Sequence, residues 1–170
     1  MAQSKPRGSA KARRTAARLA AVQALYQIAI TKRPAAEVVA EFVEFRIGHK
    51  VDGATFVPAD ITTLTAIVQG ARAGRAEIAG LANKAMKKPL EHDKLELLLQ
   101  AILDAGIWEL ARNTDLPAAI IIAEYVDVAR GFYGGTEPGM INGVLDRVAR
   151  DLRANEMGTP QATEVAEDAG

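Results

Sequence analysis

Apolar residues recur every three or four positions along most of this chain, a period typical of amphipathic helices. Ser9 can cap the first such pattern, which predicts a helix from Ser9 to about Ile30. A second helix is predicted for residues 35–46, where apolar residues and glutamates alternate at helical spacing. Residues 48–59 contain Gly and Pro and lack this period, so a loop is expected there.

Four further helices are predicted in the rest of the chain. A long one spans residues 60–86, with Asp60 as its cap. Asp93 is expected to cap the next helix, whose apolar residues cover so much of its circumference that it should be the central, most buried one. The last two helices are predicted for residues 117–132 and 136–154.

These patterns, with no strand pattern among them, predict an all-α fold. A helical domain is expected over residues 9–154, between a flexible basic segment at 1–8 and a disordered acidic tail at 155–170. The composition agrees, because 49% of residues are hydrophobic but only 5% are aromatic. The chain has no cysteine, which excludes disulfides, thiolate metal sites and a cysteine nucleophile.

Charge is distributed unevenly along this neutral chain. The first 36 residues carry eight Lys or Arg and no Asp or Glu, whereas the remaining residues are net negative by eight. A basic segment on an acidic body points to an anionic partner, either nucleic acid or, less often, a membrane surface or a targeting signal. Because no apolar run is long enough for a signal peptide or a membrane span, we expect a cytoplasmic protein that does not bind membranes, with a mitochondrial transit peptide as the alternative.

Four of these cations share one side of the first predicted helix. At about 100° per residue, Arg7, Lys11, Arg14 and Arg18 fall within about 60° of one another. No carboxylate is expected to neutralise the row, which favours nucleic-acid phosphates over an ordinary solvated face. Tyr26 is the one aromatic residue near the row, and by itself it makes a poor stacking platform for unpaired bases.

The sequence contains none of the motifs that we would expect of a common enzyme. It has no phosphate loop, no dinucleotide fingerprint and no HExxH or ExxH pair. His49 and His92 stand alone, so each is interpreted as solvated or locally hydrogen-bonded rather than as a metal ligand. We therefore expect no catalysis, no metal and no cofactor.

Four stretches together resemble the NusB family of transcription antitermination factors. They are KARRTAARLAAVQALYQ at 11–27, LLQAILDAGIWELAR at 98–112, DLPAAIIIAEYVDVARGF at 115–132 and MINGVLDRVAR at 140–150. The resemblance implies a helical bundle of about six to seven helices in two packed subdomains. It also implies binding to boxA-type single-stranded RNA of ribosomal RNA leaders, together with the ribosomal protein NusE, within an RNA polymerase antitermination complex.

The resemblance also suggests roles for individual residues. The family's arginine-rich RNA element corresponds to part of the basic segment, and a tyrosine implicated in function is matched here; these RNA-binding residues are Arg7, Lys11, Arg13, Arg14, Arg18 and Tyr26. NusE is expected on the central or the following helix, where exposed acids are predicted at Asp93, Asp104, Glu109 and Asp127. Two positions depart from the family pattern: Leu99 replaces a common acidic residue, and Asp104 replaces a usual arginine.

Two other interpretations stay open at this point. The chain could be the RNA-binding domain that precedes a ribosomal-RNA cytosine methyltransferase, although no catalytic cysteine is present. It could also be a NusB-like module without an antitermination role, such as a helical scaffold that binds only protein, although that would leave the basic row unexplained. Some members of the family self-associate, so both a monomer and a homodimer fit the sequence.

Overall fold

The computed structural model describes residues 8–45, 50–51, 54–55 and 57–157, and these form an almost entirely helical protein. The described residues contain eight α-helices, one 3-10 helix and one pair of two-residue strands. In chain order they are α1 (Ala10–Thr31), α2 (Ala35–Phe45), β1 (Lys50–Val51), β2 (Ala54–Thr55), α3 (Ile61–Ala73), α4 (Arg75–Ala85), η1 (His92–Lys94), α5 (Leu97–Arg112), α6 (Ala118–Phe132), α7 (Glu137–Leu152) and α8 (Ala154–Met157).

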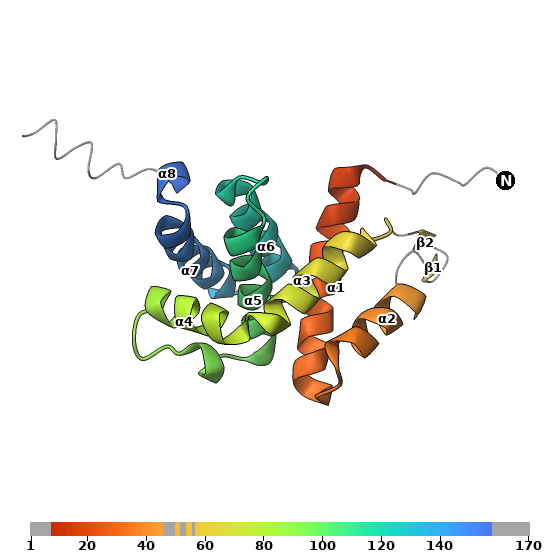
Figure 1. Ribbon diagram of the computed structural model, residues 1–170, viewed down its shortest axis with the longest axis horizontal. Helices are drawn as coiled ribbons and strands as arrows, with labels where there is room; N and C mark the ends of the chain where they lie inside the picture. The colour runs from red at the N-terminus through yellow and green to blue at the C-terminus, as the bar shows by residue number, and fades with distance from the viewer. Residues whose placement is uncertain (1–7, 46–49, 52–53, 56, 158–170) are drawn as a thin grey trace, which may run out of the picture.

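The helices form two groups that meet along α5. Helices α1, α2 and α3 pack on one another, while α4, α5, α6 and α7 form the second group (Figure 1). Helix α5 also contacts α1 and α3, and the buried apolar side chains of both groups belong to one continuous cluster. Two subdomains that share a core are therefore present, as the family resemblance implied.

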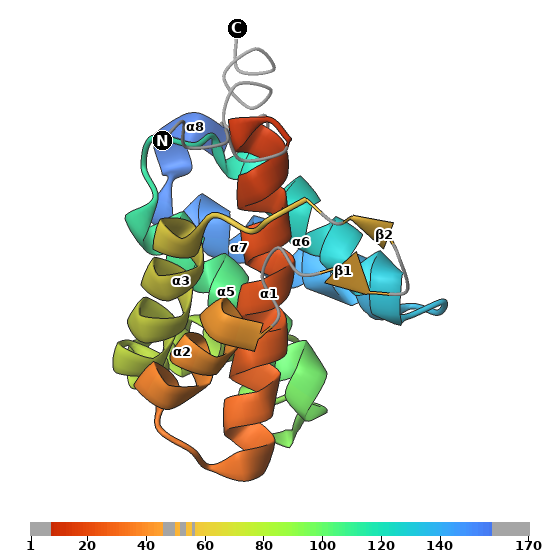
Figure 2. The same ribbon diagram turned by 90° about the vertical axis from the view of Figure 1, so that its right-hand side faces the viewer.

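Helix α1 runs the length of the first group, as Figure 2 shows. Its start is the predicted one, because the Ser9 hydroxyl oxygen accepts a hydrogen bond from the Ala12 amide at 3.0 Å. It ends at Lys32, which adopts a left-handed conformation (φ 59°) and donates its amide to the Ile28 carbonyl at 2.9 Å. The predicted helix from Ser9 to about Ile30 is thus confirmed to within one residue.

The prediction of one long helix over residues 60–86 is wrong, because the chain bends at Gly74. Gly74 has φ −93° and ψ 15°, which ends α3 and begins α4. The bend allows α3 to cross α5 at Gly70, where any side chain would collide with the indole of Trp108. Beyond the bend, α4 packs against α5 and α7 instead of continuing along α1.

Helix α5 is the most buried helix, as predicted, but Asp93 does not cap it. Asp93 lies inside the short helix η1, and α5 begins only at Leu97. Nine residues of α5 are buried, and the helix contacts α1, α3, α4, α6 and α7. This central position allows a polar side chain on α5 to meet residues from both groups.

The last helices follow the prediction except at the C-terminal end. Helices α6 and α7 occupy the expected ranges, but residues 155–157 belong to the short helix α8 rather than to a disordered tail. The Glu156 carboxylate accepts a hydrogen bond from the Ala118 amide at 2.6 Å, which fixes α8 to the start of α6. The rest of the predicted tail, 158–170, and the predicted flexible segment 1–7 lie outside the described residues.

The predicted loop at 48–59 contains the one strand pair among the described residues. Lys50 pairs with Thr55 and Val51 with Ala54, in antiparallel register. Two-residue strands are too short for a sequence pattern to reveal, and they leave the all-α assignment unchanged. None of the described helices is both long enough and apolar enough to cross a membrane.

Candidate nucleic-acid interface

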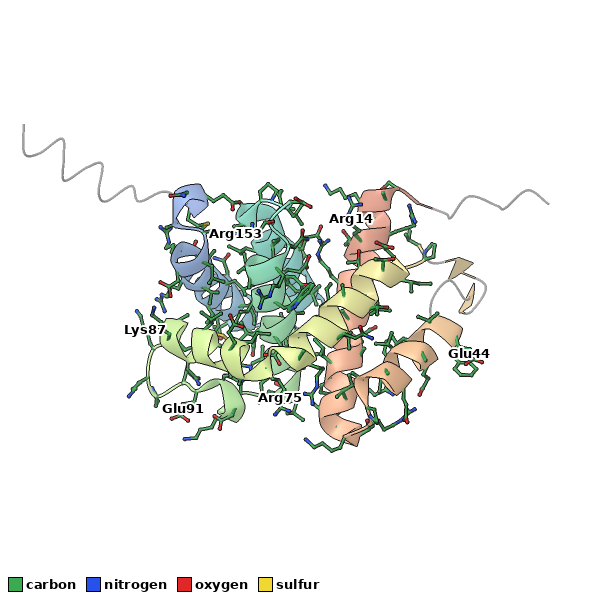
Figure 3. All side chains as sticks on the ribbon, in the orientation of Figure 1. Arg14, Glu44, Arg75, Lys87, Glu91 and Arg153 are labelled. Atoms are coloured by element: carbon green, nitrogen blue, oxygen red, sulfur yellow. The ribbon has the colours of Figure 1, made fainter. Side chains whose placement is uncertain are left out.

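The first turn of α1 presents two of the predicted cations to solvent. Lys11 and Arg14 are exposed, and Arg14 lies near the N-terminal end of α1 in Figure 3. Neither side chain has an ion pair or side-chain hydrogen bond among the described residues. Arg7, the first member of the predicted row, lies outside the described residues. Positive charge that no carboxylate neutralises is therefore concentrated at this end of α1.

Arg13 lies beside this pair and is half-buried. Its carbonyl accepts a hydrogen bond from the Asp60 amide at 2.9 Å, so the start of α3 is fixed against this turn of α1. Its guanidinium Nε is buried and has no hydrogen-bond partner among the described residues. Because this nitrogen is out of reach of solvent, it cannot itself contact a ligand, and Arg13 offers only the remainder of its half-buried side chain.

Arg18, by contrast, does not belong to the exposed row. It is only 3% exposed, and its guanidinium forms a two-pronged pair with Glu109 of α5, from Nε to Oε2 at 2.7 Å and from NH2 to Oε1 at 3.0 Å. The expectation that no acid neutralises the row is therefore wrong for Arg18. The reason is tertiary: Glu109 lies 91 residues along the chain from Arg18.

Glu109 is also the centre of a wider buried network, so the prediction that it is an exposed acid is wrong. Glu109 is 1% exposed, and its carboxylate accepts hydrogen bonds from the Tyr125 hydroxyl at 2.5 Å and from the side-chain amide of Asn113 at 3.0 Å. Tyr125 comes from α6, so the network joins α1, α5 and α6. Both oxygens of the Glu109 carboxylate have hydrogen-bond donors, and NH1 of Arg18 lies 3.9 Å from Glu124, so the buried charges are paired.

The network shifts the protonation of its members. Burial alone would lower the pKa of Arg18, but the hydrogen bond and the negative charge of Glu109 outweigh it, and the net effect raises the pKa. Burial is the main cause that raises the pKa of Tyr125 well above its usual value, and the adjacent Glu109 carboxylate adds to the effect. Arg18 therefore stays charged and Tyr125 stays neutral, so both serve the structure rather than an exposed ligand.

A groove of about 510 Å³ runs between α1 and α6 next to Lys11 and Arg14. Leu19 of α1 and Phe132 of α6 line it and are 40% and 43% exposed. Tyr26 lies two turns beyond Leu19 on the same side of α1 and is 37% exposed. The fold therefore brings the aromatic end of α6 beside the basic helix, which the position of Phe132 in the sequence does not reveal.

Tyr133, which the sequence analysis did not single out, follows Phe132 and is half-buried. Burial and the carboxylate of Glu96 raise its pKa to about 12, with Glu137 and Tyr26 contributing. Oε2 of Glu137 is buried without a hydrogen-bond partner among the described residues. The sequence signal that could have indicated it is the aromatic pair between the glycines at the end of α6.

The five residues predicted for the protein partner do not form one surface. Asp93 and Asp127 are exposed as expected, but Asp127 lines the groove between α1 and α6 whereas Asp93 lies at the other end of α1. Leu99 is 8% exposed and belongs to the core. Asp104 is largely buried and bonded to Nε2 of His92 at 2.6 Å, so it is not the exposed acid that was expected.

Of the two isolated histidines, His92 fits the interpretation of a locally hydrogen-bonded side chain. It is buried, and its own amide donates to Oδ1 of Asn83 at 2.7 Å. His49 lies outside the described residues.

Comparison with known proteins shows which family the chain resembles. The model of the NusB family matches residues 15–150. The transcription antitermination protein NusB of Brucella ovis is 42% identical over 146 residues, which cover 86% of this chain and 85% of that protein.

Two solved structures share the fold at lower identity. NusB from T. maritima has a TM-score of 0.70 at 19% identity and covers 85% of this chain and 95% of its own. A crystal structure of the antitermination factors NusB and NusE in complex with dsRNA has a TM-score of 0.69 at 20% identity and covers 84% of this chain and 99% of its own. With most of its length matched in both sequence and fold, the chain belongs to the NusB family.

Proposed function

We propose that the protein is a transcription antitermination factor that binds RNA together with a ribosomal protein of the NusE type. The observation that carries this proposal is the 42% identity, over 86% of the chain, to a protein named for transcription antitermination. A structural neighbour in complex with NusE and dsRNA adds support for the two partners. The RNA expected from the family resemblance is the boxA type of ribosomal RNA leaders.

The N-terminal end of α1 is the proposed contact for RNA phosphates. Lys11 and Arg14 are exposed and unpaired among the described residues, and the half-buried Arg13 lies beside them. Such cations fix the position of a nucleic acid without reading its sequence. Arg18 takes no part in this contact, because its side chain is buried, with Nε and NH2 bonded to Glu109 and NH1 3.9 Å from Glu124.

The groove between α1 and α6 is the proposed contact for unpaired bases. Phe132 lines the groove, and Tyr26 lies farther along α1, beyond the groove lining. Both are partly exposed, and stacking on an aromatic ring contributes about 1–3 kcal/mol per base. Gln23 lines the same groove and offers an amide for base edges. Phe132 thus adds a second aromatic side chain near the cations, where the sequence indicated only Tyr26.

Asp127 is the proposed acidic contact for the NusE-type protein on α6, because it is an exposed acid on that helix. Its carboxylate also accepts a hydrogen bond from Arg130 at 3.0 Å, an exposed pair that a basic partner can displace at little cost. Asp93 is not part of this contact, because it lines a cleft at the far end of α1, away from Asp127. The protein would act by binding rather than by catalysis, in the cytoplasm where bacterial transcription takes place.

Fluorescence anisotropy with a boxA-type RNA and a scrambled control, each with and without the cognate NusE protein, tests the proposal. We expect tighter binding to the boxA-type RNA, with a further gain when NusE is present. Equal affinity for both RNAs in both conditions would contradict the antitermination role and leave a helical protein that binds RNA without sequence preference.

A further inference from the structure

A second basic site lies at the opposite end of α1 from Lys11 and Arg14. There, a cleft of about 710 Å³ is bounded by the C-terminal end of α1, the bend between α3 and α4, η1 and the start of α5. Four cations line the cleft, at Lys32, Arg33, Arg72 and Arg75. Arg75 is labelled near the bend in Figure 3, far from Arg14.

The acids around this cleft neutralise only part of that charge. Arg33 is paired with Glu41 at 2.6 Å and with Glu37 at 3.7 Å. Asp104 lines the cleft but is bonded to His92 at 2.6 Å. The remaining acid on the cleft wall is Asp93, which is exposed.

Three cations in the cleft are left without an acidic partner. Lys32, Arg72 and Arg75 have no ion pair and no side-chain hydrogen bond among the described residues. Burial and the positive charge of Arg75 lower the pKa of Arg72, and Asp104 offsets this only in part. The half-buried Arg72 and the exposed Arg75 therefore repel each other, and a bound anion would relieve this repulsion.

We propose that this cleft binds phosphate groups of an RNA strand, as a second contact that is independent of base sequence. The planar guanidinium groups of Arg72 and Arg75 match the geometry of phosphate oxygens, and Lys32 adds a third donor from the end of α1. Among the described residues that line the cleft, none is Phe, Tyr or Trp, so no platform for stacking a base is present. Contacts of this kind hold the backbone and carry no sequence information.

One strand can reach both basic sites only if it is long enough. Lys11 and Lys32 are separated by the length of α1, roughly 32 Å at about 1.5 Å per residue. A stacked strand advances about 3.4 Å per nucleotide, so about ten nucleotides are needed to span the two sites. The inference rests on the proposed RNA binding, and it predicts that RNA length decides whether the cleft contributes.

The test compares the wild type with an Arg72→Ala/Arg75→Ala variant on boxA-type RNAs of about 6 and about 16 nucleotides, by anisotropy at several salt concentrations. Each phosphate contact in a single strand contributes about 0.7 to the slope of log K against log salt, so on the longer RNA the variant should lose about 1.4. When salt rises from 50 to 200 mM, the affinity of the variant for the longer RNA should therefore fall about sevenfold less than the affinity of the wild type. On the shorter RNA the two proteins should have equal slopes.

Two further variants keep the test decisive. Lys32→Gly removes one charge at a left-handed position that glycine adopts without strain, so it should fold normally and lose about 0.7 of the slope on the longer RNA. Lys87→Ala/Lys88→Ala removes two exposed charges beyond the far end of α4, where Figure 3 labels Lys87, and should leave both slopes unchanged.

The outcomes separate this inference from the proposed function. If the cleft variants keep the wild-type slope on the longer RNA while Lys11→Ala/Arg14→Ala loses binding, the cleft proposal is wrong and the proposed function stands. If the control at Lys87 and Lys88 lowers the slope as much as the cleft variants do, general charge explains the effect and the proposal is also wrong. Unchanged RNA binding with lost binding of poly-L-glutamate would assign the cleft to acidic protein instead, and no RNA binding by the wild type would contradict the proposed function itself.

Discussion

Arg18 and Glu109 form a buried ion pair that ties α1 of the first group of helices to α5 of the second. Both side chains are at most 3% exposed, and Tyr125 and Asn113 complete the hydrogen bonds of the Glu109 carboxylate. A buried pair of this kind contributes little relative to apolar packing, but the loss of one partner leaves a buried charge without compensation. The pair therefore makes the joint between the two groups sensitive to single substitutions.

We predict that Arg18→Ala lowers the free energy of unfolding by about 3–5 kcal/mol, because Glu109 then stays buried without its cation. Urea denaturation measures the change, and Arg14→Ala is the matched control, since an exposed arginine should alter stability by less than about 0.5 kcal/mol. A loss below about 1 kcal/mol for Arg18→Ala would contradict the role assigned to the pair. It follows that lost RNA binding in an Arg18 variant would report unfolding and not a missing contact.

Tyr125 makes the stability depend on alkaline pH. Its pKa is raised in the folded protein, so between the unfolded value near 10 and the higher folded value only the unfolded chain loses this proton. The unfolded state then binds fewer protons, and the free energy of unfolding falls as pH rises above about 10, by up to about 1.4 kcal/mol per pH unit for this group. Urea denaturation at pH 9, 10 and 11 should show a smaller decrease for Tyr125→Phe than for the wild type, and parallel curves would exclude Tyr125 as the cause.

At the residue scale, the sequence predicts which side chains are charged but not which charges are neutralised. Helical spacing places Lys11, Arg14 and Arg18 on one ridge, and the structure agrees with that spacing. Whether a member of the ridge meets solvent or Glu109 depends on where α5 crosses α1, which no local pattern contains. The sequence likewise predicts an exposed carboxylate at Asp104, whereas the fold brings His92 of η1 within hydrogen-bond distance of it.

Between elements, the closest approach of α3 to α5 depends on a glycine. We predict that Gly70→Ala destabilises the protein by about 1–3 kcal/mol or more, because the added methyl group would collide with the indole of Trp108. Gly80→Ala is the control within α4, where an added Cβ meets no atom within 4 Å and should stabilise the helix by about 0.5–1 kcal/mol. Thermal unfolding of the two variants should therefore shift in opposite directions, and equal shifts would rule out the steric explanation.

Element boundaries follow from the sequence where a local cap sets them. Ser9 and the proline before α6 mark helix starts to within one residue. The sequence indicates Gly74 only as one of three weak points of the long predicted helix, with Gly70 and Gly80, because an isolated glycine inside a helical pattern is usually tolerated. The packing of α3 and α4 against different neighbours decides that the break falls at Gly74. Helix α8 was missed because four residues have no period; the Arg153 side chain holds its start against the carbonyls of Leu110 and Leu116 at 2.9 and 2.7 Å.

For the molecule as a whole, the all-α class and the two subdomains could be predicted, since long amphipathic patterns and a family resemblance carry that information. The candidate site could be predicted only at its basic end. The aromatic groove requires α6 to lie beside α1, and the cleft requires residues from α1, α3, α4, η1 and α5 to converge. Such convergence is a property of the packed fold and not of any single segment.

The exposed positive charge of the molecule's proposed RNA contact is concentrated at the N-terminal end of α1. With Arg18 neutralised by Glu109, Lys11 and Arg14 are the described, exposed cations of the original row. We predict that Lys11→Ala/Arg14→Ala lowers the slope of log K against log salt for a boxA-type RNA by about 1.4, since two single-strand phosphate contacts are lost at about 0.7 each. Phosphate contacts carry no sequence information, so the ratio of affinities for boxA-type and scrambled RNA should stay the same while both affinities fall.

Anisotropy titrations of both RNAs, with Lys87→Ala/Lys88→Ala as the charge-matched control, measure both quantities. An unchanged slope with a collapsed affinity ratio would mean that Lys11 and Arg14 contact bases, which places base recognition on α1 itself rather than in the groove that α1 forms with α6.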